Sequence, residues 1–150
     1  MGHTVNSIFI KSPFSLVFDV SNQIERWTEL FGDEYVKAEV LKREGNEITF
    51  RLTDDENKSW VSKRWLYKDL KFAYASRHEP MFPFVYMKII WLFHENKEGT
   101  LMTWIQDFEM DAGAKYDDKK VEGFINEHSQ HNLKIFKDVI EQEARQLLAK

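Results

Sequence analysis

The sequence predicts an α+β protein in which a long C-terminal helix packs across a curved antiparallel sheet. Between residues 36 and 110, apolar side chains recur with a period of two, the spacing of strands that bury one face. Short turn segments separate these runs, so neighbouring strands are expected to pair antiparallel. From about residue 118 to about residue 148 the period is that of an amphipathic helix. A sheet and a helix of this kind bury their apolar faces together when the sheet curls around the helix.

The segment before the sheet contains one strand and two short helices. The run Thr4–Ile10 is typical of a strand. Ser12 is expected to cap the first helix, with Pro13 at its first position, where a missing N–H costs nothing. A second short helix covers residues 24–31 and ends at Gly32. The apolar residues of the two helices are Phe14, Val17, Phe18, Val20, Ile24, Trp27, Leu30 and Phe31.

Six further strands complete a predicted sheet of seven. The turns between them fall at residues 45–46, 54–58, 68–69 and 96–99, which are rich in Gly, Asn, Asp and Lys. Because such short turns join consecutive runs, we expect an antiparallel meander. The predicted strands are Val36–Arg43, Glu47–Thr53, Ser59–Tyr67, Phe72–His78, Val85–His94 and Thr100–Met110.

The long helix is expected to begin at Asp117-Asp118 and to run to about Leu148. Carboxylates at its start suit the positive end of the helix dipole. Two polar residues, His128 and Asn132, fall on the apolar side and are candidates for the interior. The apolar stripe itself comprises Val121, Phe124, Ile125, Ile135, Phe136, Val139 and Ile140.

The composition excludes several classes of function. The chain has 150 residues, a net charge of −4 and no cysteine, which excludes disulfides, thiolate metal sites and a Cys nucleophile. No Lys/Arg cluster indicates a nucleic-acid surface, and no apolar run reaches the roughly 20 residues of a membrane helix. The N-terminus lacks the apolar core of a signal peptide, so we expect a cytoplasmic protein. Without repeats or linkers, residues 1–150 are expected to form a single domain.

Motifs for metal, triad and phosphate chemistry are missing from the sequence. His128 and His131 stand at positions i and i+3, but no third ligand completes a metal site by spacing. No nucleophile elbow supports a Ser-His-Asp triad, and no Gly-rich loop would hold a phosphate. The unusual feature is the 15% of aromatic residues, which either fill a core or line a cavity for a flat or apolar ligand.

Polar residues on apolar faces are candidates for lining such a cavity, because a buried polar group needs a partner. Gln106 falls on the apolar face of its strand, and Met87 and Trp91 share the apolar face of another. In strand 59–67, alternation alone does not decide which face is inside. One face carries Trp60, Ser62 and Arg64, and the other carries Val61, Lys63 and Trp65. Each polar candidate also fits an ordinary structural role, such as a backbone hydrogen bond or a salt bridge at the rim.

Segments in order along nearly the whole chain resemble bacterial polyketide aromatase/cyclases. The first lies in residues 13–31, with Pro13-Phe14, Leu16-Val17, Asp19-Val20, Asn22, Ile24-Glu25, Trp27 and Glu29-Leu30-Phe31. The others are Glu39-Val40-Leu41, Phe50-Arg51-Leu52, Trp60-Val61-Ser62 with Arg64, Tyr86-Met87, Trp104-Ile105-Gln106-Asp107-Phe108, and Asn132-Leu133 with Ile135. The chain is most similar to the single-domain first-ring aromatase/cyclases of type II polyketide synthases, such as the tetracenomycin and spore-pigment enzymes.

The resemblance implies a helix-grip fold of the START/Bet v 1 type with an internal pocket. It implies a poly-β-ketone substrate that an acyl carrier protein delivers, within a type II polyketide synthase that includes a ketosynthase. It implies that the protein directs an intramolecular aldol closure of the first ring and the loss of water that makes the ring aromatic. No cofactor or metal is implied.

The resemblance also assigns residues to the pocket. Arg64 resembles the family's central pocket arginine, Tyr35 its pocket tyrosine and Arg77 its second arginine, which makes the face of Trp60, Ser62 and Arg64 the inner one. Arg64, Tyr35 and Ser62 are expected to be catalytic. The residues expected to bind substrate are Trp60, Arg77, Met87, Trp91, Trp104, Gln106, His128 and Asn132.

The chain departs from the family pattern at residues 78–84, which lack a Gly-Pro turn, at the short loop 54–58 and in the segment 121–130. These differences leave the polyketide length and the joined carbons open. Two other functions fit the same fold: a non-catalytic carrier of an apolar molecule, and a lipid-type START module that assists quinone biosynthesis. A deep arginine with Tyr35 and Ser62 favours the cyclase, since a lipid carrier has little need of it. His128 is a candidate general base.

Overall fold

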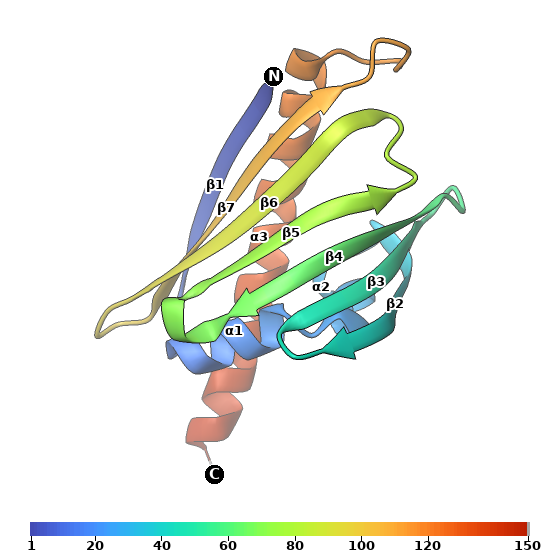
Figure 1. The fold of residues 1–150 in the computed structure, drawn as a ribbon. Helices are drawn as coiled ribbons and strands as arrows, with labels where there is room; N and C mark the ends of the chain where they lie inside the picture. The colour runs from blue at the N-terminus through green and yellow to red at the C-terminus, as the bar shows by residue number, and fades with distance from the viewer. Residues whose placement is uncertain (150) are drawn as a thin grey trace.

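The computed structural model describes residues 1–149 and contains one seven-stranded sheet, two short helices and one long helix (Figure 1). The strands are β1 (Gly2–Ile10), β2 (Tyr35–Glu44), β3 (Glu47–Asp54), β4 (Ser59–Tyr67), β5 (Phe72–Glu79), β6 (Phe84–Glu95) and β7 (Thr100–Met110). The α-helices are α1 (Phe14–Ser21), α2 (Trp27–Leu30) and α3 (Asp118–Leu148), and single 3-10 turns lie at η1 (Ile24–Arg26) and η2 (Lys68–Leu70). The predicted strands and the long helix are confirmed, with ends that differ by one or two residues.

The strands follow the order β1-β7-β6-β5-β4-β3-β2, and every neighbouring pair is antiparallel. The predicted meander therefore holds from β2 to β7. Strand β1 does not extend it at β2 but pairs with β7 at the opposite edge, with Gly2 opposite Phe108 and Ile10 opposite Thr100. The first and last strands of the chain are thus neighbours, which brings the N-terminal segment under the long helix.

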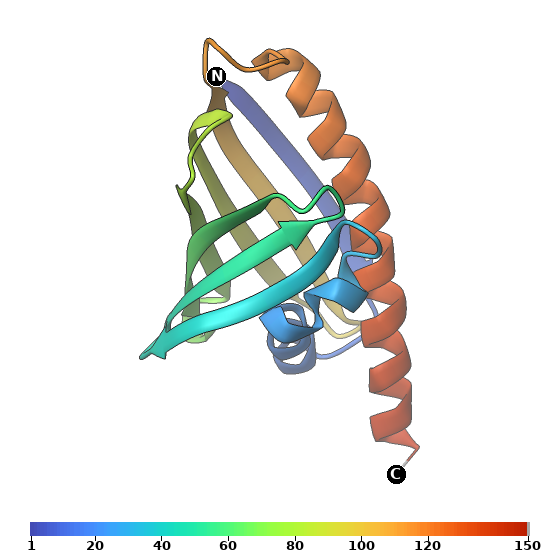
Figure 2. The same cartoon turned by 90° about the vertical axis from the view of Figure 1, so that its right-hand side faces the viewer.

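The sheet curves around α3, as expected. Figure 2 shows α3 lying across the open side of the curved sheet, with α1 and α2 between the sheet and the helix at one end. Register shifts interrupt the ladders of β2 with β3, β4 with β5, and β6 with β7. Bulges of this kind bend and twist a strand, so they favour the curvature.

Alternation places one face of each strand against the helices. Met102, Trp104, Gln106 and Phe108 in β7 are all buried, as the alternation predicts. In β4 the buried residues are Ser62 and Arg64, which confirms the face that the resemblance indicated. The residues of α3 that reach the core are Val121, Ser129, Asn132, Leu133, Phe136, Ile140 and Ala144.

Two local predictions about the short helices are wrong. Helix α1 begins at Phe14 with Pro13 at the N-cap, and Ser12 forms no side-chain cap, because its hydroxyl donates to the Pro13 carbonyl. A carboxylate from β6 takes the role of the cap: the Phe14 N–H donates to Glu95 Oε2 at 2.9 Å. The second helix is not continuous over residues 24–31 but is divided into η1 and α2. Gly32 ends it as predicted, since it follows the C-cap Phe31 with a φ of 63°, which favours glycine.

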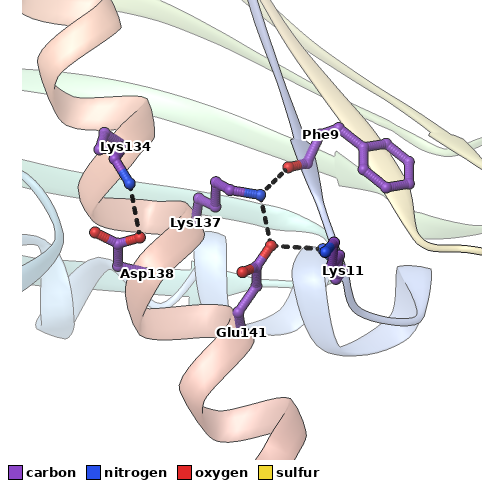
Figure 3. A network of polar contacts seen from close by, with 6 residues as sticks. All are labelled: Phe9, Lys11, Lys134, Lys137, Asp138 and Glu141. Atoms are coloured by element: carbon purple, nitrogen blue, oxygen red, sulfur yellow. Dashed lines mark hydrogen bonds and ion pairs between the residues drawn. The ribbon is translucent and has the colours of Figure 1, made fainter.

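Helix α3 is fastened to the end of β1 by four groups that we term the anchor cluster: the Phe9 carbonyl, the Lys11 N–H, Lys137 and Glu141 (Figure 3). Lys137 Nζ donates to the Phe9 carbonyl at 2.7 Å and to Glu141 Oε2 at 2.6 Å, and the Lys11 N–H donates to the same carboxylate oxygen at 2.8 Å. Every charge in this cluster has an opposite or dipolar partner. These contacts hold α3 against the end of β1.

Candidate active site

The sheet, α3 and the end of α2 enclose a cavity of about 860 Å³. This volume lies within the range of small-molecule sites in proteins, roughly 300 to 1,000 Å³. Every residue that the sequence analysis assigned to the site lines this one cavity: Tyr35, Trp60, Ser62, Arg64, Arg77, Met87, Trp91, Trp104, Gln106, His128 and Asn132. The tertiary structure therefore brings together residues from five strands and the long helix.

Arg64 lies at the floor of the cavity and is only 1% exposed. Its Nε donates to Asn22 Oδ1 at 2.7 Å, and its guanidinium carbon lies 4.1 Å from the centre of the Trp91 ring. Its Nη2 has no hydrogen-bond partner within residues 1–149. Burial lowers the pKa of Arg64 to about 9, which leaves the guanidinium charged at neutral pH. The site thus holds a buried cation with donor capacity left for a ligand.

Aromatic rings form the wall beside Arg64. Trp91 stacks on Trp104 with ring centres 4.6 Å apart, and Trp104 stacks on Phe31 at 5.6 Å. Phe136 of α3 packs edge-on against Trp91, Trp104 and Phe31. The indole Nε1 of Trp104 is buried and also lacks a partner within residues 1–149. These flat rings and spare donors suit a planar ligand that carries oxygen acceptors.

Arg77 and Tyr35 lie at the side of the cavity near Trp60. The Arg77 guanidinium carbon lies 4.8 Å from the Trp60 ring centre, and its Nε and Nη2 donate to the carbonyls of Pro80 and Phe82 at 2.8 and 3.1 Å. Burial lowers the pKa of Arg77 to about 10, against an opposite effect of Tyr35. Burial, with Glu34 acting in the same direction, raises the pKa of the Tyr35 phenol well above its usual value. Tyr35 is therefore a phenol that can donate a proton, not a phenolate.

Helix α3 contributes polar groups in pairs with other elements. Gln106 Nε2 donates to the hydroxyl of Ser129 at 3.2 Å, and Asn132 Nδ2 donates to Glu34 Oε2 at 3.0 Å. The His128 side chain is 65% exposed and lies at the rim, 3.4 Å from Glu34 Oε1, so it is not an interior residue of the stripe. Ser129, one position later, takes the interior place.

Acidic residues surround the exposed rim of the cavity: Asp33, Glu34, Asp54, Asp55 and Glu127. Burial raises the pKa of the Glu34 carboxyl, and the facing groups His128, Asn132 and His131 oppose this rise without cancelling it. Within residues 1–149 no group of three or more His, Cys, Asp or Glu side chains is arranged to hold a metal ion. No helix among those residues is both long and apolar enough to cross a membrane.

Three residues of the site were missed as functional candidates from the sequence. Ser129 fits the helical spacing of the buried residues at 132, 133 and 136, so a stripe shifted by one residue would have included it. Glu34 follows the second helix, and Asn22 follows the first. Their importance depends on partners at positions 132 and 64, which are distant in sequence and come together only in the folded chain.

The fold defines the class of this protein: a START-like helix-grip protein, with an internal cavity between the sheet and α3. The crystal structure of the Zhui aromatase/cyclase from Streptomyces sp. R1128 matches it with a TM-score of 0.78 at 18% identity, over 97% of this chain and 94% of that one. A STAR-related lipid transfer protein from Xanthomonas axonopodis matches with a TM-score of 0.75 at 14% identity, over 92% of this chain and 85% of that one. At these identities the likeness shows the shared fold.

Sequence similarity identifies the family. The family model "Polyketide cyclase / dehydrase and lipid transport" matches residues 10–137. A Streptomyces cyaneus protein named "Putative polyketide cyclase" is 44% identical over 146 residues, which cover 94% of this chain and 95% of that protein. The chain belongs to the polyketide cyclase/dehydrase and lipid transport family. Membership of this family and the 44% identical relative support a role as a polyketide cyclase.

Proposed function

We propose that this protein is an aromatase/cyclase that folds a carrier-bound poly-β-ketone in its cavity and directs the aldol closure and dehydration of the first ring. The observation that carries the proposal is Arg64, a charged guanidinium buried beneath aromatic walls with Nη2 unbonded within residues 1–149. A buried cation without a carboxylate is costly to keep, so its retention favours a role toward a ligand. A ketone or enolate oxygen of the ligand would accept a hydrogen bond from the unbonded Nη2 of Arg64.

The chemistry needs a stabilised oxygen anion. A methylene carbon between two ketones loses a proton, and the resulting enolate carbon attacks a second ketone along the same chain. One carbon–carbon bond forms, the attacked carbonyl becomes an alkoxide, and protonation gives a hydroxyl group. Arg64 is suited to both the enolate and the alkoxide oxygen, because preorganised donors in a dry site stabilise charge as it develops.

Dehydration needs a proton donor near the new hydroxyl group. That group leaves as water while the neighbouring carbon loses a proton, and enolisation of the remaining ketones completes the aromatic ring. Tyr35 suits this step because its raised pKa keeps the phenol protonated, and the buried Ser62 hydroxyl, which lines the same cavity, can relay the proton. The steps form one carbon–carbon bond within the chain, transfer protons and release one water without a net change of oxidation state, so they need no redox cofactor.

The aromatic walls supply the second part of the mechanism, which is selection of one folded form of the chain. A poly-β-ketone can close at several carbons, and only one near-attack arrangement gives a single product. The stack of Trp91, Trp104 and Phe31 with Met87 offers flat apolar surface against which the chain would fold. We further propose that an acyl carrier protein of a type II synthase, which also supplies the ketosynthase, delivers the chain at the rim.

Co-production with a minimal type II synthase tests the proposal. With the protein present, one product that carries an aromatic first ring should replace the mixture of spontaneously closed products. An unchanged mixture would reject the cyclase function. If the purified protein then still bound polyketide shunt products without altering their pattern, it would be a carrier. Arg64→Ala, produced at the same level, should return the mixture.

A further inference from the structure

Arg64 is held in an unusual way for a buried arginine. Within residues 1–149, the only hydrogen bond of its side chain runs from Nε to Asn22 Oδ1 at 2.7 Å, and no carboxylate forms an ion pair with it. The guanidinium carbon lies 4.1 Å from the Trp91 ring centre and 5.4 Å from that of Trp27, and these two ring centres are 5.9 Å apart, so the two indoles lie side by side against it. The indoles and the Asn22 amide oxygen are therefore the groups that hold the guanidinium in place.

Asn22 is itself held in one orientation. It follows the last residue of α1, is 5% exposed, and donates from Nδ2 to the carbonyl of Phe18 at 2.8 Å. The amide nitrogen is therefore engaged with the helix end, and the amide oxygen is the group that faces Arg64. The opposite orientation would direct N–H groups at a cation. The position of the Arg64 guanidinium at the floor of the cavity therefore depends on the position of the end of α1.

A neutral acceptor at this place has a consequence that a carboxylate would not have. Aspartate or glutamate in ion-pair contact with a guanidinium commonly engages two N–H groups and offsets its charge. One amide oxygen engages Nε alone, and the charge keeps its full effect on a ligand. The same reasoning predicts different outcomes for Asn22→Leu, which removes the acceptor, and Asn22→Asp, which keeps an acceptor and adds a charge.

We propose that Asn22 is the positioning residue of the site: it holds Arg64 by Nε so that the terminal amino groups are presented to the ligand with undiminished charge. The effect of Asn22 on the reaction rests on the proposed cyclase function, whereas its hydrogen bond to Arg64 does not. Ser21 provides a matched control. Its hydroxyl also donates to the Phe18 carbonyl, at 3.2 Å, and its side chain is fully buried, yet it has no hydrogen bond to Arg64.

The first experiment needs no substrate. In ¹⁵N-labelled protein, with the Arg64 Nε–H signal assigned by its loss in Arg64→Lys, exchange of that proton with water is measured. Asn22→Leu should accelerate exchange by about tenfold or more, since hydrogen bonds to charged groups contribute that much. Asn22→Asp and Ser21→Ala should leave it slow. An unchanged exchange rate in Asn22→Leu would overturn the proposal. If Asn22→Leu does not fold, the test uses the folded Asn22→Asp variant, in which accelerated exchange would overturn the proposal.

The second experiment measures cyclisation in a double-mutant cycle. Asn22→Leu should lower kcat by about tenfold with little change in KM, and Ser21→Ala should lower neither. In an Arg64→Lys background, which has no Nε–H, Asn22→Leu should cost nothing further. Asn22→Asp should lower kcat although it keeps the hydrogen bond. An equal loss in both backgrounds would show a merely structural role. If the wild type does not cyclise while the exchange results hold, only the proposed function fails.

Discussion

The anchor cluster and the floor of the cavity both contain a buried or half-buried cation, and they treat it in opposite ways. In the anchor cluster, Lys137 lies against the Glu141 carboxylate and the Phe9 carbonyl, so its charge is matched where the helix meets β1. At the cavity floor, Arg64 is more deeply buried and has one amide oxygen and two aromatic faces. Matched charges fasten elements together, whereas an unmatched charge is a cost to the fold that a ligand can relieve. The difference separates the part of the molecule that holds the structure from the part that acts.

Arg64→Met should give the largest effect and should separate activity from stability. Loss of the guanidinium should lower the rate of cyclisation by about 10²- to 10³-fold, the usual cost of removing a donor to a developing oxyanion. The free energy of unfolding should stay level or rise, because an apolar chain of similar length replaces a buried unpaired charge. Urea unfolding and product assays of the same preparation check both. If Arg64→Met lost more unfolding free energy than Glu141→Gln in the anchor cluster, the charge of Arg64 would serve to stabilise the fold.

Glu141→Gln should show the opposite pattern. The variant should lose about 1–2 kcal/mol of unfolding free energy at pH 7, because Lys137 and the Lys11 N–H lose a charged acceptor, and cyclisation should be unaffected. Burial alone would raise the pKa of Glu141, but the Lys11 N–H and Lys137 outweigh it, so its pKa is lowered from 4.5. A lowered folded-state pKa stabilises above pH 4.5, and this stability is lost as the pH falls through the lowered value.

Urea unfolding of wild type and Glu141→Gln between pH 7 and pH 3 checks this dependence. The difference between the two proteins should be full at pH 7 and should shrink below pH 4.5, as the wild-type carboxyl takes up a proton. If the difference in unfolding free energy stayed constant from pH 7 to pH 3, the carboxylate charge would not contribute to stability, and the loss in Glu141→Gln would come from poorer packing of the amide.

Glu34→Gln should produce a smaller effect of opposite sign. Burial raises the pKa of Glu34 above 4.5, against His128, Asn132 and His131 of α3, so its ionised form weakens the fold at neutral pH. As the pH falls from neutrality towards 4.5, the wild type should gain stability relative to Glu34→Gln, by less than about 1 kcal/mol. Urea unfolding at pH 7, 6 and 5 measures the difference. A relative loss of wild-type stability over this range would contradict the assignment.

Lys134→Ala should have the smallest effect. Lys134 and Asp138 form an ion pair one helical turn apart, 3.2 Å long, beside the anchor cluster, but their side chains are 66% and 61% exposed (Figure 3). An exposed pair of this spacing contributes about 0.3–0.5 kcal/mol. The variant is therefore the surface control for Glu141→Gln on the same helix. Thermal unfolding should place its midpoint within about 2 °C of the wild type, and a shift as large as that of the Glu141 variant would remove the distinction.

The sequence by itself determined the element order, since strand alternation and helical spacing are local patterns that depend on which residues face the core. It also determined the inner residues of β7, because Gln106 stands among Met102, Trp104 and Phe108 at alternate positions. The inner face of β4 was another matter. Polar and apolar residues occur on both of its faces, so only resemblance selected the face of Arg64, and the structure confirms it.

Only the tertiary structure decided which partners the buried polar groups meet. The pairing of β1 with β7, the contact of Asn22 with Arg64 and that of Glu34 with Asn132 join residues that are 42 or more positions apart. No local pattern encodes such contacts, because they depend on how far the sheet curves and where α3 crosses it. The same geometry moved His128 to the rim and placed Ser129 inside. The sequence therefore specified the walls of the cavity, and the packing of the helices on the sheet decided how the charge at its floor is held.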